Sequence, residues 1–329
     1  MGITGFMKNM IQENSNIKKR EYEETYIDCN YLLHYFIYNC KNDEDLYKKT
    51  YNYFKYMFSM METTKIIYLI FDGKHPHHLQ QINPKKQTQE QREKYKKESN
   101  EYDKQKIAPK TEIVSTFKTF LEQSINSIKK MYNNNLKIVI NDDTKEDEAD
   151  FKILDSISES KYKKICIVSR DSDMVLIAYS MINKKKIKID ILSNLKPIKF
   201  INVNEISNKY NLDYILVILF LGNDYLPKLS NIDYDEIINC YNNYIKHKNS
   251  NIIEGNNINY DNLVNFITYI IVNKNIKFNI KKIQSERFEI YYNNILWCLK
   301  KYKVIENNKS YIEDTNNVIN IYNFINHKK

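Results

Sequence analysis

Glycine, proline, cysteine and tryptophan are all scarce in this chain, with 5, 5, 5 and 1 of them in 329 residues. The cysteines are scattered, odd in number and form no Cys-x-x-Cys pair. We therefore expect an intracellular protein with neither a disulfide framework nor a structural zinc site. The longest apolar run, residues 214–221, is too short to cross a bilayer, and the amino terminus lacks the layout of a signal peptide. The sequence thus predicts a soluble protein with no membrane partner.

Two of the five glycines lie within two residues of an aspartate in an acidic motif. Gly73 directly follows Asp72, and Gly222 lies two residues before Asp224. In a chain this poor in glycine, each glycine indicates a backbone turn or a close approach that other residues could not supply. These glycines therefore mark Asp72 and Asp224 as residues in tight, specialised loops.

Composition allows a real core and favours a polyanionic partner. The chain is 42% hydrophobic and 28% charged, which is typical of a globular protein of one large or two modest domains. Its net charge is +9. Asn, Lys, Ile and Tyr are abundant, which is typical of proteins encoded by AT-rich genomes. Because this bias also raises the lysine content, the net charge is only modest support for nucleic-acid binding.

Short apolar, β-branched runs alternate with helical stretches, which predicts a mainly parallel α/β sheet flanked by helices. We predict strands at residues 26–27, 66–71, 136–140, 165–169 and 187–192. We predict helices at residues 30–38, 45–60, 111–131 and 147–158, with further helical periodicity at 263–272 and 288–302. Residues 80–106 are highly charged and are expected to form an exposed helix or arm.

Acidic residues follow several of these strands. In an open parallel sheet, ligands bind beyond the carboxyl ends of the strands. Two divalent ions about 3.5–4 Å apart can activate a water molecule and stabilise the leaving oxygen of a phosphodiester, and Mg²⁺ prefers oxygen ligands. Clustered carboxylates repel one another unless cations neutralise them. The sequence predicts that seven carboxylates form such a site: Asp28, Asp72, Glu148, Asp150, Asp171, Asp173 and Asp224.

These motifs, in this order, resemble those of the XRN family of 5′→3′ exoribonucleases, within the flap-endonuclease and PIN-like superfamily. Residues 28–34 resemble Asp-Met-Asn-Gly-Ile-Ile-His, and residues 71–76 resemble Ile-Asp-Gly-Val-Ala-Pro. Residues 147–154 are similar to Gly-Glu-Gly-Glu-His-Lys-Ile-Met, residues 170–174 to Leu-Asp-Ala-Asp-Leu, and residues 221–227 to Val-Gly-Asn-Asp-Phe-Ile-Pro. The amino terminus, residues 1–6, and residues 107–112 also resemble family segments.

The resemblance implies a PIN-like or flap-nuclease-like α/β fold with a Rossmann-like core and a helical carboxyl-terminal part. It places the nuclease domain at residues 1–235 and a helical extension, a partial second conserved region, at 236–329. The implied activity is Mg²⁺-dependent (or Mn²⁺-dependent) hydrolysis of single-stranded RNA from the 5′ end by two metal ions. The expected role is RNA degradation in the cytoplasm or the nucleus.

The family holds the 5′-phosphate with a basic arm of Lys, Gln and paired Arg residues. Here Lys85, Lys86 and Arg92 are the candidates for that role. Lysine offers a point charge where arginine offers a bidentate fork, so the preference for a 5′-phosphate is an open question. His34 stands where the family stacks a histidine on the first base, although a histidine in an apolar helix is more often a packed residue.

Two other functions stay open from the sequence. One is a structure-specific flap DNA nuclease or a 5′→3′ DNA exonuclease, because the superfamily shares the acidic core. The other is a catalytically weak homologue that binds RNA. The complete acidic set argues against the second.

Overall fold

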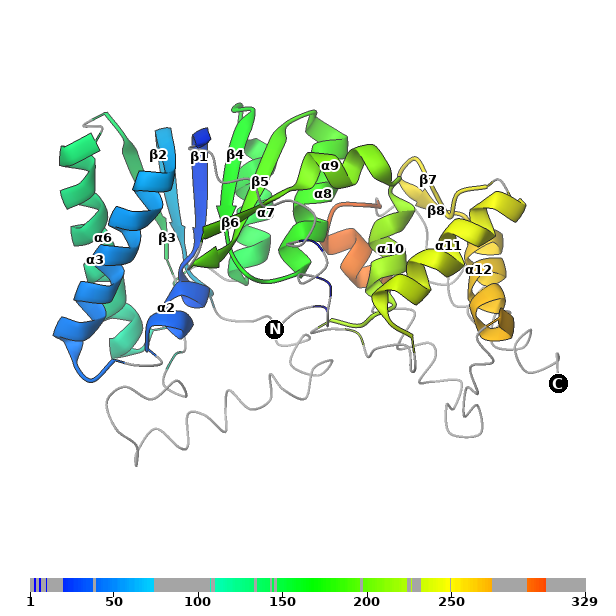
Figure 1. Cartoon of the computed structure of the whole chain (residues 1–329), viewed down its shortest axis with the longest axis horizontal. Coiled ribbons are helices and arrows are strands. Elements are labelled where there is room, and N and C mark those ends of the chain that lie inside the picture. The colour runs from blue at the N-terminus through cyan, green and yellow to red at the C-terminus, as the bar shows by residue number, and fades with distance from the viewer. Residues whose placement is uncertain are drawn as a thin grey trace. The chain divides into compact units, whose positions relative to one another are not determined.

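The structure is a computed structural model of the whole chain (Figure 1). It describes residues 3, 6, 10, 20–37, 40–73, 107, 110–132, 135–142, 144, 147–195, 198–223, 226, 232–248, 250–273 and 295–305. Its contacts divide the chain into two compact units. One unit comprises residues 10–206, and the other combines residues 1–9 with residues 207–329.

The larger unit is built on a six-stranded sheet in the order β3-β2-β1-β4-β5-β6. Its strands are β1 (Arg20–Asp28), β2 (Met61–Ile70), β3 (Lys137–Asn141), β4 (Lys164–Val168), β5 (Lys188–Leu195) and β6 (Ile198–Asn202). The pairings from β3 through β5 are all parallel, whereas β6 runs antiparallel to β5. The predicted α/β fold with a mainly parallel sheet is confirmed.

Helices connect the parallel strands, as parallel pairing requires. They are α2 (Cys29–Ile37), α3 (Asp43–Met60), α6 (Glu112–Tyr132), α7 (Ala149–Glu159) and α8 (Asp173–Lys185), and α9 (Val203–Lys209) follows β6. All four helices predicted before residue 160 exist, with ends that differ by at most two residues from the predicted ones. The charged segment at 80–106 lies outside the described residues.

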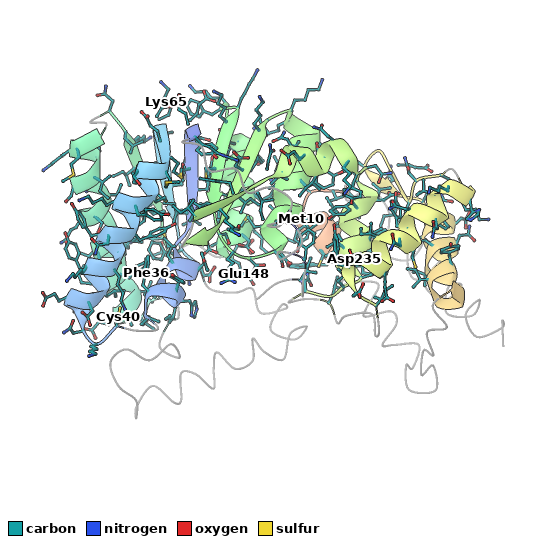
Figure 2. All side chains as sticks on the ribbon, viewed as in Figure 1. Met10, Phe36, Cys40, Lys65, Glu148 and Asp235 are labelled. Atoms are coloured by element: carbon teal, nitrogen blue, oxygen red, sulfur yellow. The ribbon has the colours of Figure 1, made fainter. Side chains whose placement is uncertain are left out.

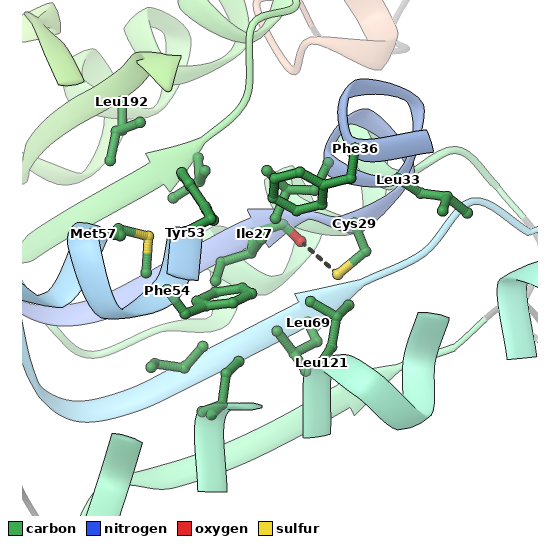
Figure 3. Close-up of a cluster of buried hydrophobic side chains, with 14 of the residues drawn as sticks. Ile27, Cys29, Leu33, Phe36, Tyr53, Phe54, Met57, Leu69, Leu121 and Leu192 are labelled. Carbon is green, nitrogen blue, oxygen red and sulfur yellow. Dashed lines mark hydrogen bonds between the residues drawn. The ribbon is translucent and has the colours of Figure 1, made fainter. Parts of the chain in front are cut away.

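Side chains are buried on both faces of the sheet near the carboxyl ends of β1, β2 and β4, which explains the apolar runs there. On one face, side chains of β1 and β2 pack against α2, α3 and α6, as Figure 3 shows for Ile27, Leu69, Phe54 and Leu121. The opposite face includes Ile167, which is fully buried, and α7 packs against β1 and β2. The central strands are therefore fixed from both sides.

The strand register brings the carboxyl ends of the central strands together. Asp28, the last residue of β1, pairs with Ile70, the last residue of β2. On the other side of β1, Ile27 pairs with Val168, the last residue of β4. Residues that follow these three strands therefore emerge at one edge of the sheet.

The smaller unit is mainly helical in its described part. It contains α10 (Asp213–Leu219), α11 (Tyr234–Lys248), α12 (Tyr260–Asn273) and a short hairpin of β7 (Ile253–Glu254) and β8 (Asn257–Ile258). The buried carboxylate of Asp213 accepts hydrogen bonds from the backbone N–H groups of Ile252 and Ile253, at 2.8 and 2.6 Å, and from the Tyr241 hydroxyl at 2.7 Å. Asp213 thus fastens the hairpin to α10 and α11.

The helix predicted at 263–272 is α12, and the one predicted at 288–302 is described only from residue 295 onward, where a helix runs to residue 301. The predicted division at residue 235 stays a prediction about the extent of the nuclease domain. Among the helices that the structure describes, none combines the length and the apolar character needed to span a membrane.

Candidate active site

Three predicted acids lie where three neighbouring parallel strands end. Asp28 is the last residue of β1, Asp72 follows the end of β2 by two residues, and Asp171 follows the end of β4 by three. Because β1 lies between β2 and β4, these residues share one edge of the sheet. Glu148, labelled in Figure 2, directly precedes Ala149, whose backbone N–H donates to the Asp72 carboxylate. The carboxyl edge is therefore strongly acidic.

A series of hydrogen bonds links the acids of β1 and β4. The Asp28 carboxylate accepts from the backbone N–H of Tyr31 at 2.9 Å and from the Ser169 hydroxyl at 3.1 Å. The same hydroxyl accepts from the backbone N–H of Asp171 at 3.1 Å, and the Asp171 carboxylate accepts from the N–H of Asp173 at 3.0 Å. These bonds fix the carboxylates of Asp28 and Asp171 and the backbone of Asp173 relative to the sheet.

Asp72 is held between α2 and α7. Its backbone N–H donates to the Asn30 side chain at 3.1 Å, and its carboxylate accepts from the backbone N–H of Ala149, the first residue of α7, at 2.8 Å. The next residue, Gly73, donates its N–H to the Asp147 carbonyl at 2.8 Å. Asp72 thus accepts a hydrogen bond from one of the free N–H groups at the start of α7, although it lies 77 positions before Ala149 in the chain.

Two further acids lie at the start of α7. Glu148 is its N-cap residue but makes no capping hydrogen bond with its side chain, and Asp150 lies in the first turn. Asp173 occupies the same place in α8 and is buried. Acidic residues in the first turn of a helix are common because the helix dipole favours negative charge there.

The pKa shifts show that these carboxylates act on one another. Burial first, and then the charge of Asp72, raise the pKa of Asp28 from 3.8 to about 7. Burial also raises the pKa of Asp150 well above its ordinary value, with further contributions from Asp171, Asp28, Asp72 and Asp173. Asp150 therefore lies within electrostatic reach of the other four. We call these five residues, Asp28, Asp72, Asp150, Asp171 and Asp173, the edge cluster.

The donor chemistry of the edge cluster suits a hard divalent cation, because it offers only oxygen atoms. Within the described ranges, no group of three or more His, Cys, Asp or Glu side chains is arranged so that it could hold a metal ion as it stands. An ion would therefore have to draw carboxylates together against their mutual repulsion. A cation would in turn remove the repulsion that raises the pKa values of Asp28 and Asp150.

A buried lysine ties the ends of β2 and β3 together behind the cluster. Lys152 is 6% exposed. Its ammonium donates to the carbonyl of Phe71, the residue before Asp72, at 2.9 Å, and to the carbonyl of Asp142 at 3.0 Å. A lysine is seldom buried unless its charge is paired or fully hydrogen-bonded. Lys152 therefore fixes the backbone from which Asp72 extends.

The structure brings five of the predicted site residues into the edge cluster and places Glu148 beside Asp150. His34 is exposed in the last turn of α2. The remaining predicted residues, Asp224, Lys85, Lys86 and Arg92, lie outside the described part of the chain.

Sequence reasoning did not single out Ser169, Asn30 or Lys152. Ser169 and Asn30 each lie two residues from a predicted ligand, Asp171 and Asp28, so proximity to the motif was the available signal. For Lys152 the signal was a single lysine within the apolar run 151–154 of α7.

Comparison with known proteins gives one family and several solved structures. The family model for the XRN 5′-3′ exonuclease N-terminus matches residues 3–193. The catalytic core of Rad2 in complex with DNA substrate is 11% identical, covers 89% of this chain and 85% of its own, and has a TM-score of 0.45. A T5 5′-exonuclease with bound divalent metal ions (zinc) is 13% identical, covers 92% and 100%, and has a TM-score of 0.41. No curated protein sequence matches the chain.

Proposed function

The chain belongs to the XRN 5′-3′ exonuclease N-terminus family, whose model matches residues 3–193, and is a 5′-3′ nuclease. From that premise we propose that it hydrolyses single-stranded RNA from the 5′ end with two Mg²⁺ or Mn²⁺ ions, as part of RNA degradation in the cytoplasm or nucleus. The observation that carries the metal-dependent mechanism is the edge cluster, in which four other carboxylates lie within electrostatic reach of Asp150. Such a cluster costs folding free energy, and divalent cations offset that cost.

We assign the metal ligands to Asp28, Asp72, Glu148, Asp150, Asp171 and Asp173, with Asp224 added from its motif. When bound, the ions supply an activated water molecule and stabilise the leaving oxygen. The protein orients two of these ligands beforehand. Ser169 directs one oxygen of Asp28, and the N–H of Ala149 directs one oxygen of Asp72. Such preorganisation lowers the free energy needed to arrange the carboxylates around an ion.

The substrate assignment rests on charge and on the family motifs. A net charge of +9 favours a polyanion. Lys85, Lys86 and Arg92 would receive the 5′-phosphate, and His34, which is exposed on α2, would stack on the first base. The edge cluster itself does not distinguish RNA from DNA, because it acts on the phosphodiester.

We expect a 5′-phosphorylated single-stranded RNA to be degraded at least about tenfold faster than the matched DNA strand, which corresponds to about 1.4 kcal/mol of transition-state binding. The measurement is digestion of matched 20-nucleotide RNA and DNA strands with 5′-phosphate, hydroxyl or triphosphate ends in Mg²⁺. Strands labelled at either end separate stepwise release from internal cleavage. Faster cleavage of the DNA, or of a DNA flap, would replace the RNA assignment with the DNA-nuclease alternative.

Lys152 gives a separate test of the positioning of Asp72. We expect Lys152→Met to lower the free energy of unfolding by about 2 kcal/mol, because two buried carbonyl oxygens lose a donor. The turnover number should fall by more than the folded fraction does, because the backbone before Asp72 is no longer fixed. The measurements are urea unfolding and initial rates with saturating RNA.

Lys185 provides the matched control. Its ammonium also donates to backbone carbonyls, those of Ile157, Ser158 and Ser160, but at the other end of α7. Lys185→Met should lower stability and leave the turnover number of the folded protein unchanged. Equal losses of turnover in both variants would show that Lys152 acts on stability alone.

A further inference from the structure

Arg170 is an exposed arginine next to the edge cluster. It lies between the end of β4 and Asp171. No hydrogen bond or ion pair of its guanidinium is found within the part of the chain that the structure describes. In that part, Arg170 therefore does not serve as a direct ion-pair partner of the neighbouring carboxylates.

Tyr31 lies on α2 close to both Arg170 and Asp28. Its backbone N–H is bonded to the Asp28 carboxylate at 2.9 Å, which places the residue at the carboxyl edge. Burial raises the pKa of the Tyr31 hydroxyl, and the positive charge of Arg170 acts against that rise. The hydroxyl of Ser169, the residue before Arg170, donates to the same Asp28 carboxylate at 3.1 Å, so the chain segments that carry Tyr31 and Arg170 meet at Asp28. The Tyr31 side chain is only partly buried.

Both residues depart from the motifs that this chain otherwise resembles. Tyr31 stands at the glycine of Asp-Met-Asn-Gly-Ile-Ile-His, and Arg170 stands at the first leucine of Leu-Asp-Ala-Asp-Leu. Two groups without side-chain hydrogen-bonding capacity are therefore replaced by a guanidinium and a phenol. The fold brings the segments that carry these two replacements to the carboxylate of Asp28, which bonds to the N–H of Tyr31 and to the hydroxyl of Ser169.

The chemistry of this pair fits a phosphate group. A guanidinium stays charged at all physiological pH values and can donate two parallel hydrogen bonds to phosphate, and a phenol can donate a third. The edge cluster repels a polyanion, so a fixed cation beside it assists the approach of a nucleic-acid strand. Tyr35, one helical turn beyond Tyr31, is 43% exposed, so the surface continues with an accessible aromatic ring.

We propose that Arg170 and Tyr31 form a phosphate subsite that binds the single-stranded nucleic-acid substrate immediately beside the edge cluster. In this subsite Arg170 binds one backbone phosphate through its guanidinium fork, and the Tyr31 hydroxyl donates to the same phosphate. The subsite deepens the proposed nuclease function and rests on it. It would supply in this chain the arginine fork that Lys85 and Lys86 do not offer.

The test is binding and turnover of a 5′-phosphorylated single-stranded RNA by Arg170→Gln, Arg170→Lys and Tyr31→Phe. Binding is measured by fluorescence anisotropy in EDTA, and KM and kcat are measured in Mg²⁺. We expect Arg170→Gln to weaken binding about tenfold and to reduce the slope of log affinity against log salt by about 0.7, as loss of one phosphate contact to a single strand predicts. KM should rise with little change in kcat, because the contact is made equally in substrate and transition state.

Two comparisons make the result specific. Lys164→Gln removes an exposed positive charge at the opposite end of the same strand, β4, and should leave KM unchanged. In a double-mutant cycle, Tyr31→Phe should weaken binding about threefold alone and have a smaller effect in the Arg170→Gln background, because both groups hold one phosphate. Arg170→Lys should recover the salt slope but only part of the affinity.

The outcomes separate this inference from the proposed function. If the unmodified chain cleaves RNA or DNA while Arg170→Gln binds it with unchanged affinity and salt slope, the subsite is overturned and the nuclease function stands. If Arg170→Gln instead lowers the melting temperature in EDTA with unchanged binding, Arg170 is a structural counter-charge of the edge cluster. If the unmodified chain neither binds nor cleaves nucleic acid, both proposals fail.

Discussion

Asp28→Asn is expected to reduce cleavage of nucleic acid by at least about a thousandfold, or about 4 kcal/mol of transition-state stabilisation, while raising the melting temperature of the metal-free protein. Asparagine keeps an oxygen that can accept from the N–H of Tyr31, and its amide can donate to the Ser169 hydroxyl oxygen, which reverses the direction of that bond. It removes the buried charge whose cost raises the pKa of Asp28 to about 7. Thermal melts in EDTA and initial rates in Mg²⁺ measure the two effects.

Asp190 offers a matched control with the opposite sign. It is also a strand carboxylate, but it is paired with Arg20 at 2.7 Å and accepts the Tyr22 hydroxyl at 2.7 Å. Asp190→Asn should lower the melting temperature and leave the activity of the folded protein intact. An active Asp28→Asn protein, or one that melts earlier than the unmodified protein in EDTA, would contradict the assignment of Asp28 to a metal-binding edge.

The metal-free protein should become less stable as the pH rises from 5 to 8. The pKa of Asp28 is about 7 in the folded state against 3.8 for the ordinary group, and that of Asp150 is also raised. The folded state then binds more protons than the unfolded state between these values, so the free energy of unfolding falls as the pH rises through them. Asp28 alone corresponds to a loss of about 3 kcal/mol between pH 5 and pH 8, since its pKa of about 7 lies about two units above pH 5 and one pKa unit is about 1.4 kcal/mol.

Mg²⁺ is expected to remove most of this loss, because an ion that binds only the folded state stabilises it by mass action. The measurement is a series of melts from pH 4 to pH 9 with EDTA or Mg²⁺, on the unmodified protein and on Asp28→Asn. Burial also raises the pKa of Asp213, which contributes with the same sign and should not respond to Mg²⁺. Stability that increases from pH 5 to pH 8 in EDTA would exclude a repulsive edge cluster.

The sequence predicted the parallel sheet because β1, β2 and β4 each contain a buried apolar run that stops at or just before a polar residue. It could not show where β1 begins, since its first residues, Arg-Glu-Tyr-Glu-Glu, are charged. The structure accounts for these charges through distant partners. Arg20 pairs with Asp190, and the buried carboxylate of Glu24 accepts from the Ser160 hydroxyl at 2.6 Å. These partners lie 170 and 136 positions away, a distance over which local pattern carries no information.

The candidate site also contains some residues that could be predicted from the sequence and others that could not. Asp28, Asp72 and Asp171 were predictable because a parallel sheet gathers whatever follows its strands. The antiparallel strand β6 and the buried state of Lys152 were not, because both depend on tertiary packing. A lysine in a helix is normally solvated, and only the fold shows that Lys152 faces two backbone carbonyls. The residues that orient the site were thus harder to predict than the residues that form it.

The hydrogen bond from Ala149 to Asp72 has a consequence for the divergence of this family. Asp72 caps α7 as well as belonging to the edge cluster, whereas no hydrogen bond of the Asp150 carboxylate is found among the described residues. In a descendant that no longer cleaved nucleic acid, selection on folding would preserve Asp72, and replacement of Asp150 would be neutral or stabilising. An acid at position 72 therefore says little about whether a relative is still active, and an acid at position 150 says much more.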